Sequence, residues 1–195
     1  MPGLMLQRGV HMIKKFLARF SMFHMVIIAL MAGLGVATKP IIVPLAHIIT
    51  GPLYIPGGVI AGGFYMLWIV LGAGLVARKG TATLIATVQA VMMVSLGIYG
   101  THGLVSFFTY IIPGLAVDFI LLFFKNYQEA LPCFLGGIAA NLSGTFLVNI
   151  VFFRLPLIPL LLSLGSAALS GGLGGLIAHS VIKQFKKFDI IEIET

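Results

Sequence analysis

The chain has 195 residues, of which 59% are hydrophobic and only 9% are charged. A soluble domain is about half apolar and about a quarter charged. Twelve basic and 5 acidic side chains, with a mean hydropathy of +1.13, therefore exclude a soluble globule and predict an integral membrane protein. The single cysteine, Cys133, excludes an intrachain disulfide and a cysteine-based metal cage.

Length limits the architecture, because each spanning helix takes roughly 20 residues and leaves little room for anything but short loops. We expect an all-α integral membrane protein, a single domain over residues 1–195, with six transmembrane helices. The predicted spans are about 20–37, 54–77, 81–99, 104–124, 130–153 and 157–182.

The first span follows a basic segment and is interpreted as a retained helix, because its apolar run is longer than that of a cleaved signal peptide. Residues 39–52 are short and broken by Pro40, Pro44 and Pro52, which predicts a structured, proline-rich outer loop. Residues 78–80, Arg-Lys-Gly, predict that the second span ends with a helix-terminating Gly80.

Basic residues are distributed unequally over the loops and ends. If the N-terminus is cytoplasmic, only Lys39 and Arg154 lie outside, and ten of the 12 basic residues lie inside: Arg8, Lys14, Lys15, Arg19, Arg78, Lys79, Lys125, Lys183, Lys186 and Lys187. The positive-inside rule then predicts a multi-pass protein of a prokaryotic cell membrane with both termini cytoplasmic. The same rule explains the net charge of +7 without nucleic acid as a partner.

Small residues recur every four positions on several spans, a spacing that lets helices approach closely in lipid. Later stripes, such as Ala167, Gly171 and Gly175, are interpreted as packing inside the bundle. The stripe on the first span is instead a candidate docking surface for a partner membrane protein, and its residues are Ala29, Gly33 and Ala37.

Polar side chains within apolar spans are candidates for substrate binding, because they are costly in lipid. Asp118 is the acid placed well within a span, with a hydrogen bond to Gln89 or a tyrosine on a neighbouring helix as the alternative role, and Gln89 is itself a further substrate-binding candidate. Asn141, Thr145 and Asn149 share one helix face and predict a polar pocket that opens outward, with interhelical hydrogen bonds as the alternative.

Aromatic residues near the outer span ends indicate either an interfacial belt or a pocket for a flat heterocycle. His47 in the expected outer loop would close this pocket, and the aromatic candidates are Tyr65, Trp68, His102 and Tyr110. The five histidines lack a metal-ligand spacing, so we predict no metal site and no cofactor. The sequence also lacks a Walker motif, a nucleophile elbow and His-Glu-x-x-His, which favours a protein that is not an enzyme.

The chain resembles the S components of energy-coupling factor (ECF) vitamin transporters, and within them the YkoE family. The resemblance lies in residues 63–84, GFYMLWIVLGAGLVARKGTATL, in Leu96-Gly97, and in residues 114–118, which end in Asp118. It implies a substrate-capturing subunit that joins a transmembrane scaffold and two cytosolic ATPases, with Ala29, Gly33 and Ala37 meeting the scaffold. It further implies a ligand similar to thiamine or hydroxymethylpyrimidine.

The sequence departs from that family at positions that tend to carry carboxylates, where Thr87, Val94 and Asn149 stand here. A cationic ring with only Asp118 to neutralise it would be poorly held, which favours a neutral or weakly basic heterocycle. The alternative function is a stand-alone secondary transporter or channel, although no internal repeat typical of such carriers is visible. A membrane-embedded enzyme would need more reactive groups than Asp118 alone.

Overall fold

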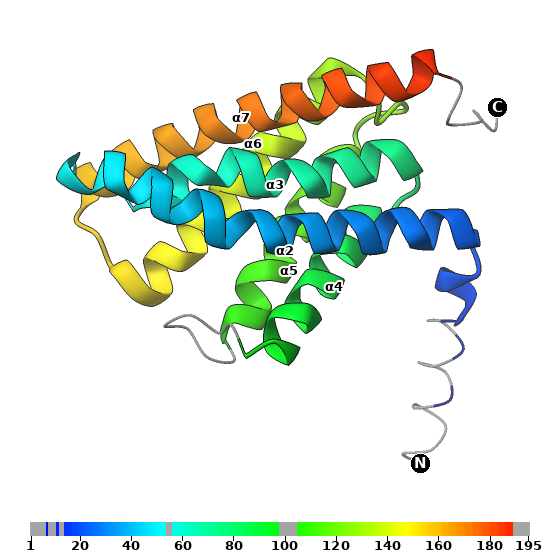
Figure 1. Ribbon diagram of the computed structural model, residues 1–195, viewed down its shortest axis with the longest axis horizontal. Helices are drawn as coiled ribbons and strands as arrows, with labels where there is room; N and C mark the ends of the chain where they lie inside the picture. The colour runs from blue at the N-terminus through cyan, green and yellow to red at the C-terminus, as the bar shows by residue number, and fades with distance from the viewer. Residues whose placement is uncertain (1–6, 8–10, 12–13, 54–55, 98–104, 189–195) are drawn as a thin grey trace.

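The computed structural model describes the chain except for residues 1–6, 8–10, 12–13, 54–55, 98–104 and 189–195. The regular elements in the described residues are all helical, which confirms the predicted all-α class (Figure 1). They are α2 (Met22–Thr50), η1 (Gly51–Leu53), α3 (Gly57–Val76), α4 (Thr81–Ser95), α5 (Val105–Leu121), α6 (Ala130–Val148), η3 (Asn149–Phe153) and α7 (Leu157–Lys187). The segment η3 is a π-helix that continues α6, and η1 is a single 3-10 turn.

Four helices in the described residues are long and apolar enough to cross a membrane: Met22–Thr50, Gly57–Val76, Ala130–Phe153 and Leu157–Lys187. The third and fourth predicted spans correspond to α4 and α5, which are apolar but shorter. Helices therefore occupy all six predicted positions. Whether α4 and α5 cross the whole bilayer stays a prediction.

The segment 39–52 differs most from the sequence prediction. We expected a loop, but α2 continues through Pro40 and Pro44 to Thr50 and changes direction toward its cyan end (Figure 1). Each proline removes one N–H donor from the helix. Leaving the helix altogether would expose many more backbone groups to lipid, so a helix with two missing bonds costs less than an open loop. The proline-rich segment is therefore part of helix α2 and not a loop.

The end of α3 also differs from the prediction. Ala77, and not Gly80, adopts the left-handed conformation that terminates the helix, with φ 52°, and its N–H donates to the carbonyl of Ala73 at 2.9 Å. Gly80, with φ 88°, instead precedes α4. The predicted position of the turn was right and the residue that makes it was wrong.

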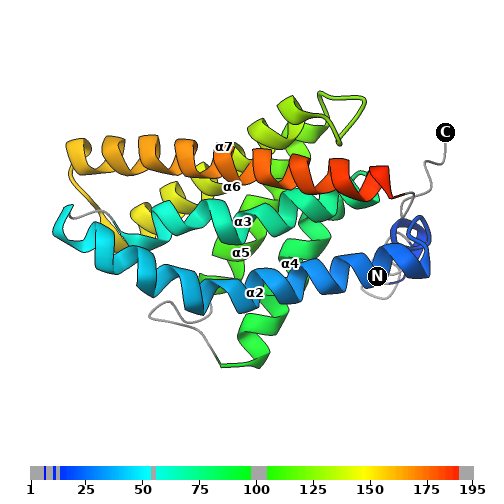
Figure 2. The same ribbon diagram turned by 45° about the horizontal axis from the view of Figure 1, so that its top comes forward.

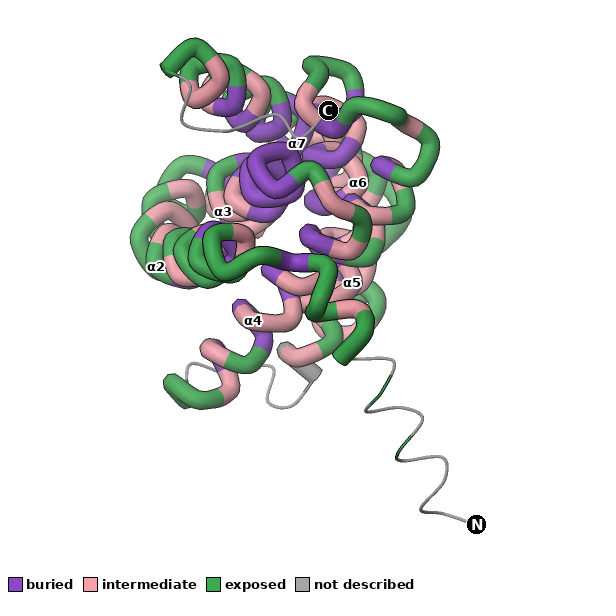
Figure 3. The backbone as a smooth tube through the Cα atoms, turned by 90° about the vertical axis from the view of Figure 1, so that its right-hand side faces the viewer, coloured by how far each residue is buried: buried purple, intermediate pink, exposed green. Residues whose placement is uncertain are grey.

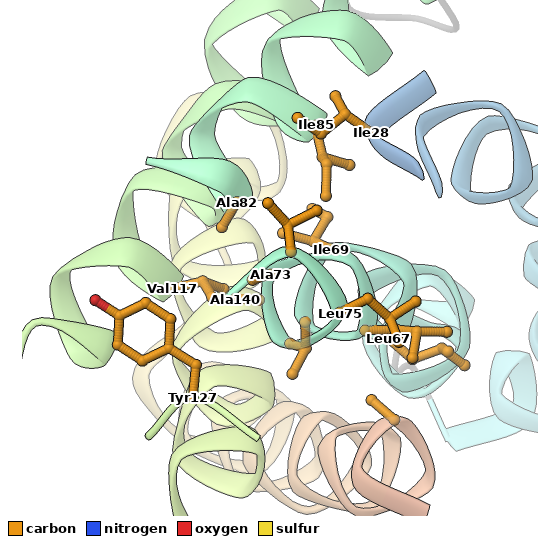
Figure 4. Packing of buried hydrophobic residues seen from close by; sticks show 14 of the residues in the cluster. Ile28, Leu67, Ile69, Ala73, Leu75, Ala82, Ile85, Val117, Tyr127 and Ala140 are labelled. Atoms are coloured by element: carbon orange, nitrogen blue, oxygen red, sulfur yellow. The ribbon is translucent and has the colours of Figure 1, made fainter. Parts of the chain in front are cut away.

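Helix α3 is the central helix of the bundle. In its most apolar stretch 78% of the residues are buried, against 33% in the corresponding stretch of each of the other three long helices. It packs against α2, α6 and α7, which leaves little of it exposed (Figure 3). Helices α2, α3 and α7 run side by side, and α4 and α5 cross them more steeply (Figures 1 and 2). In Figure 4, Ile28, Ile69 and Ile85 meet in the core between α2, α3 and α4.

Small residues face inward and large apolar residues face outward on α7, the arrangement expected where lipid is the solvent. Gly171 and Gly174 are buried, while Leu169 and Leu173 are 74% and 62% exposed. A Cβ on Gly174 would overlap the backbone of Gly63, and one on Gly171 would overlap that of Gly137. The interior-packing interpretation of this stripe is confirmed.

The stripe on α2 is oriented differently. Ala29 and Ala37 are exposed, and a Cβ on Gly33 would meet nothing within 4 Å. These three residues therefore do not serve internal packing, and their role as a docking surface stays a prediction.

Candidate functional site: a cavity at one end of the bundle

A cavity of about 690 Å³ lies at the end of the bundle where α2 and α6 finish and α3, α5 and α7 begin. Its wall contains residues from all six helices and from η3. The basic residues predicted to be cytoplasmic lie at the other end of the bundle, namely Arg78, Lys79, Lys125 and the lysines of the α7 C-terminus. In the predicted orientation the cavity therefore opens to the outside. The volume is within the range of about 300–1,000 Å³ typical of small-molecule sites.

Six of the sequence-predicted site residues line this cavity, although they come from six different elements. They are His47, Tyr65, Gln89, Tyr110, Thr145 and Asn149. Their contact with a ligand stays a prediction, but the structure brings these six residues to one cavity.

Asn149 lies where α6 changes into the π-helix η3. Its side-chain oxygen accepts a hydrogen bond from the Leu155 N–H at 3.0 Å, and its carbonyl accepts one from the Arg154 N–H at 2.7 Å. Arg154 adopts the left-handed conformation, with φ 46°, and ends the π-helix. Such single π-turns are frequent at functional sites, and here the turn forms one edge of the cavity.

Lys39 is a cavity residue that sequence reasoning missed, since we had assigned it only to an outer loop. Its Nζ donates to the Tyr110 hydroxyl at 2.7 Å and lies 4.2 Å from the centroid of the Tyr110 ring. The Tyr65 ring centroid is 5.3 Å from the same atom. The sequence did contain a signal for this position. Gly35, Lys39 and Val43 are four residues apart, so they lie on one face if α2 continues as a helix.

Two side chains in the wall have buried polar atoms that find no hydrogen-bond partner in the described part of the chain, namely Gln89 at Nε2 and Ser163 at Oγ. Both residues are nearly inaccessible, at 4% and 2% exposed. An unpaired buried polar atom costs about 1–3 kcal/mol, so these two atoms leave unused hydrogen-bonding capacity beside the cavity. Gly35 makes room for Gln89, because a Cβ there would overlap Nε2.

His47 joins the end of α2 to the beginning of α3. Its Nδ1 accepts a hydrogen bond from the Gly57 N–H at 3.3 Å. A Cβ on Gly57 would lie only 2.6 Å from the backbone nitrogen of His47, so glycine permits this close approach. In a neutral imidazole that accepts at Nδ1, the proton is on Nε2, which leaves His47 a donor in the cavity wall.

Two other predicted site residues, Asn141 and Trp68, lie outside the cavity wall. Asn141 is 1% exposed, and its Nδ2 donates to the carbonyls of Val59 and Ala167, both at 2.9 Å, so it joins α6 to α3 and α7. Trp68 donates from Nε1 to the Thr38 hydroxyl at 3.0 Å and joins α3 to α2. For Asn141 these are the interhelical hydrogen bonds given above as its alternative role, whereas the alternative considered for Trp68 was an interfacial belt. His102 lies outside the described residues.

Asp118 lies at the opposite end of the bundle, where its carboxylate from α5 caps the beginning of α4. It accepts hydrogen bonds from the N–H of Gly80 at 3.2 Å, the N–H of Thr83 at 2.8 Å and the Thr83 hydroxyl at 2.6 Å. A negative charge at a helix N-terminus is also favoured by the helix dipole. The geometry therefore explains why an acid is tolerated here without any ligand.

We expect Asp118→Asn to lower thermal stability without weakening ligand binding, because the amide replaces one acceptor oxygen by a donor that faces N–H or O–H groups. The expected loss is roughly 1–3 kcal/mol, measured by thermal unfolding in detergent. Glu129→Gln is the matched control, since that exposed carboxylate accepts one described hydrogen bond, from Asn126 at 3.2 Å. Weaker ligand binding at unchanged stability would instead assign Asp118 to the substrate site.

Comparison with known proteins now adds to this geometry. The model of a family described as "ABC-type cobalt transport system, permease component" matches residues 20–143. A crystal structure of an S-component of an ECF transporter has the same fold, with a TM-score of 0.73, 18% sequence identity and 88% of each chain covered. No curated protein matches the chain. At this identity the likeness to the solved structure establishes the fold, and it confirms the fold that the sequence resemblance implied.

Proposed function

Because the chain belongs to the family of ABC-type cobalt transport system permease components, we propose that it is the substrate-binding membrane subunit of an ECF importer. The observation that carries the proposal is the cavity of about 690 Å³ at one end of a fold that an S-component shares. In this role the multi-pass protein captures its ligand at the outer membrane surface. A transmembrane scaffold and two cytosolic ATPases then power release to the inside.

The partner surface in this proposal is the exposed stripe of Ala29, Gly33 and Ala37 on α2. Its small side chains leave the backbone accessible to another helix, and no described residue of this chain occupies the space beside Gly33. A scaffold helix packed there would lie along the same helix whose far end lines the cavity, so the partner and the ligand would contact one element.

The proposed cargo is a small heterocycle of the vitamin or vitamin-precursor class, such as hydroxymethylpyrimidine. Tyr65 and Tyr110 supply aromatic surface, and Gln89, Thr145 and Asn149 supply hydrogen-bonding groups. Cobalt, named in the family description, would need several His, Cys or carboxylate ligands. The described residues contain no group of three such side chains, and His47 is the single one among the described residues of the cavity wall. The donor set therefore favours an organic molecule over a metal ion.

We expect one vitamin or precursor to stabilise the purified protein in a thermal-shift screen of vitamins and their precursors that includes thiamine and hydroxymethylpyrimidine, with Co²⁺ as the metal. A ligand at 100 times its Kd stabilises by about 2.7 kcal/mol, which is easily measured. Native mass spectrometry would give the stoichiometry. Asn149→Ala should weaken the shift, and Asn126→Ala, at the opposite end of the bundle, is the matched control.

Transport measurements separate the proposal from its alternative. In liposomes the lone protein should mediate no uptake of the bound ligand, and uptake should require the scaffold, the ATPases and ATP. Solute flux through the lone protein would support the stand-alone secondary transporter or channel, and failure of every ligand class to bind would contradict a capture subunit.

A further inference from the structure

The charges around the cavity do not suit a cationic ligand. Among the described residues of its wall, Lys39 is the basic residue, His47 is the one histidine, and there is no aspartate or glutamate. The two acids in the described part of the chain, Asp118 and Glu129, lie at the opposite end of the bundle, at the starts of α4 and α6. A bound cation would thus face Lys39 without a compensating carboxylate.

We propose that the cavity binds a ring-bearing monocarboxylate, and that Lys39 and Tyr110 together bind its carboxylate group. This inference rests on the proposed function and specifies the substrate class of the same site. It also replaces the neutral or weakly basic heterocycle expected from the sequence, because that expectation did not include Lys39 among the cavity residues.

Hydrogen-bonding capacity supports the pair. An ammonium group has three N–H donors, and the described contacts of Lys39 use one of them, toward the Tyr110 oxygen at 2.7 Å. Because that oxygen accepts from Lys39, the Tyr110 O–H is left to donate elsewhere. The Lys39 ammonium and the Tyr110 hydroxyl are thus two neighbouring donors that match the two oxygens of a carboxylate. Hydrogen bonds between an ammonium and a carboxylate are assisted by charge and are stronger than neutral ones.

Electrostatics supports a single negative charge. Among the described residues the half-buried ammonium contacts a hydroxyl and two aromatic rings and has no ionic partner, and such a charge is costly in an apolar surrounding. One anionic group on the ligand would complete the pair. A dianionic group, such as a phosphate monoester, would exceed what one cation neutralises, so a carboxylate fits better.

The unpartnered Nε2 atom of Gln89 gives a position for the ring of the ligand. Gln89 Nε2 is buried next to Gly35, one helical turn from Lys39 on α2. A ring acceptor could receive its hydrogen bond while the carboxylate contacts Lys39. The Tyr65 and Tyr110 rings beside the same ammonium provide surfaces on which a flat ring can stack.

The test uses matched probes that differ only in charge. We would measure binding of the carboxylate, the carboxamide and the aminomethyl derivative of pyrimidine, pyridine and quinoline to the full-length protein in nanodiscs. On at least one ring, the carboxylate should bind at least 10-fold more tightly than its carboxamide, and the aminomethyl cation should bind most weakly.

Variants then assign the preference to Lys39. In Lys39→Gln the ratio of carboxylate to carboxamide affinity should fall to near one, with carboxamide binding and thermal stability retained, and Lys39→Arg should keep the preference. Arg154→Gln is the matched control. Arg154 is the other cation predicted for this end of the bundle, but its side chain is exposed and lies outside the cavity wall.

The outcomes separate the two proposals. Equal affinity for carboxylate and carboxamide, tightest binding of the cation, or an unchanged ratio in Lys39→Gln would overturn the monocarboxylate inference and leave the capture subunit in place. Failure of all probes, together with failure of the vitamins and of Co²⁺, would overturn both.

Discussion

Gly174→Leu is expected to prevent assembly of the helix bundle, whereas Gly165→Leu on the same helix is expected to leave it intact. Even a Cβ on Gly174 would overlap the backbone of Gly63, which cannot move aside as a flexible side chain would. Helices α3 and α7 would have to separate, and α3 is the buried centre of the structure. Overpacking of this kind costs roughly 3 kcal/mol or more, a large share of the stability of a small protein.

The two leucine variants are compared by the yield of monodisperse protein in detergent and by thermal unfolding. A Cβ on Gly165 meets nothing within 4 Å, so the control adds the same side chain to an exposed position. Gly174→Ala should give an intermediate loss. Equal stability of Gly174→Leu and Gly165→Leu would contradict the close contact of α3 with α7.

Thr145→Trp is expected to weaken ligand binding by roughly 100-fold, or about 2.8 kcal/mol, while the protein stays folded. Thr145 lies in the cavity wall and is half-buried, so an indole in its place occupies space that the ligand needs. Because the new surface is apolar and enters an existing cavity, the bundle does not have to expand. The measurement is the thermal shift with the vitamin or probe that binds the wild type.

Phe146→Trp is the matched control for this variant, since Phe146 is the next residue on α6, is 50% exposed and lies outside the cavity wall. It should bind the ligand as tightly as the wild type. Unchanged affinity in Thr145→Trp would show that the ligand site lies elsewhere, and the proposed function would then lose the observation that carries it.

Composition and spacing were sufficient for the all-α class and the inward-facing small residues of α7. These properties follow from local sequence, because roughly 20 apolar residues and a four-residue repeat of small side chains have few other uses in lipid. Six of the ten predicted site residues also line the cavity, since polar groups are rare in apolar spans and each therefore stands out.

The sequence could not tell which rare polar groups belong to the cavity and which hold helices together. Asn141, Thr145 and Asn149 have the same spacing, yet Asn141 donates to the carbonyls of Val59 and Ala167 while the other two line the cavity. The rotation of a helix about its axis and the depth at which neighbours cross it decide this. Both depend on residues far apart in the chain.

The sequence by itself determined that this is an apolar helical membrane protein and predicted that ten of its 12 basic residues lie at one end. Only the tertiary structure decided that α2 continues through Pro40 and Pro44, that Lys39 therefore faces Tyr110 in a cavity, and that Asp118 caps α4 instead. The amino-acid composition of a helix shows whether it is surrounded by lipid or by water. The partner of each polar group is decided by which helices pack together, because a proline or a charge within lipid is tolerated only where its neighbours compensate for it.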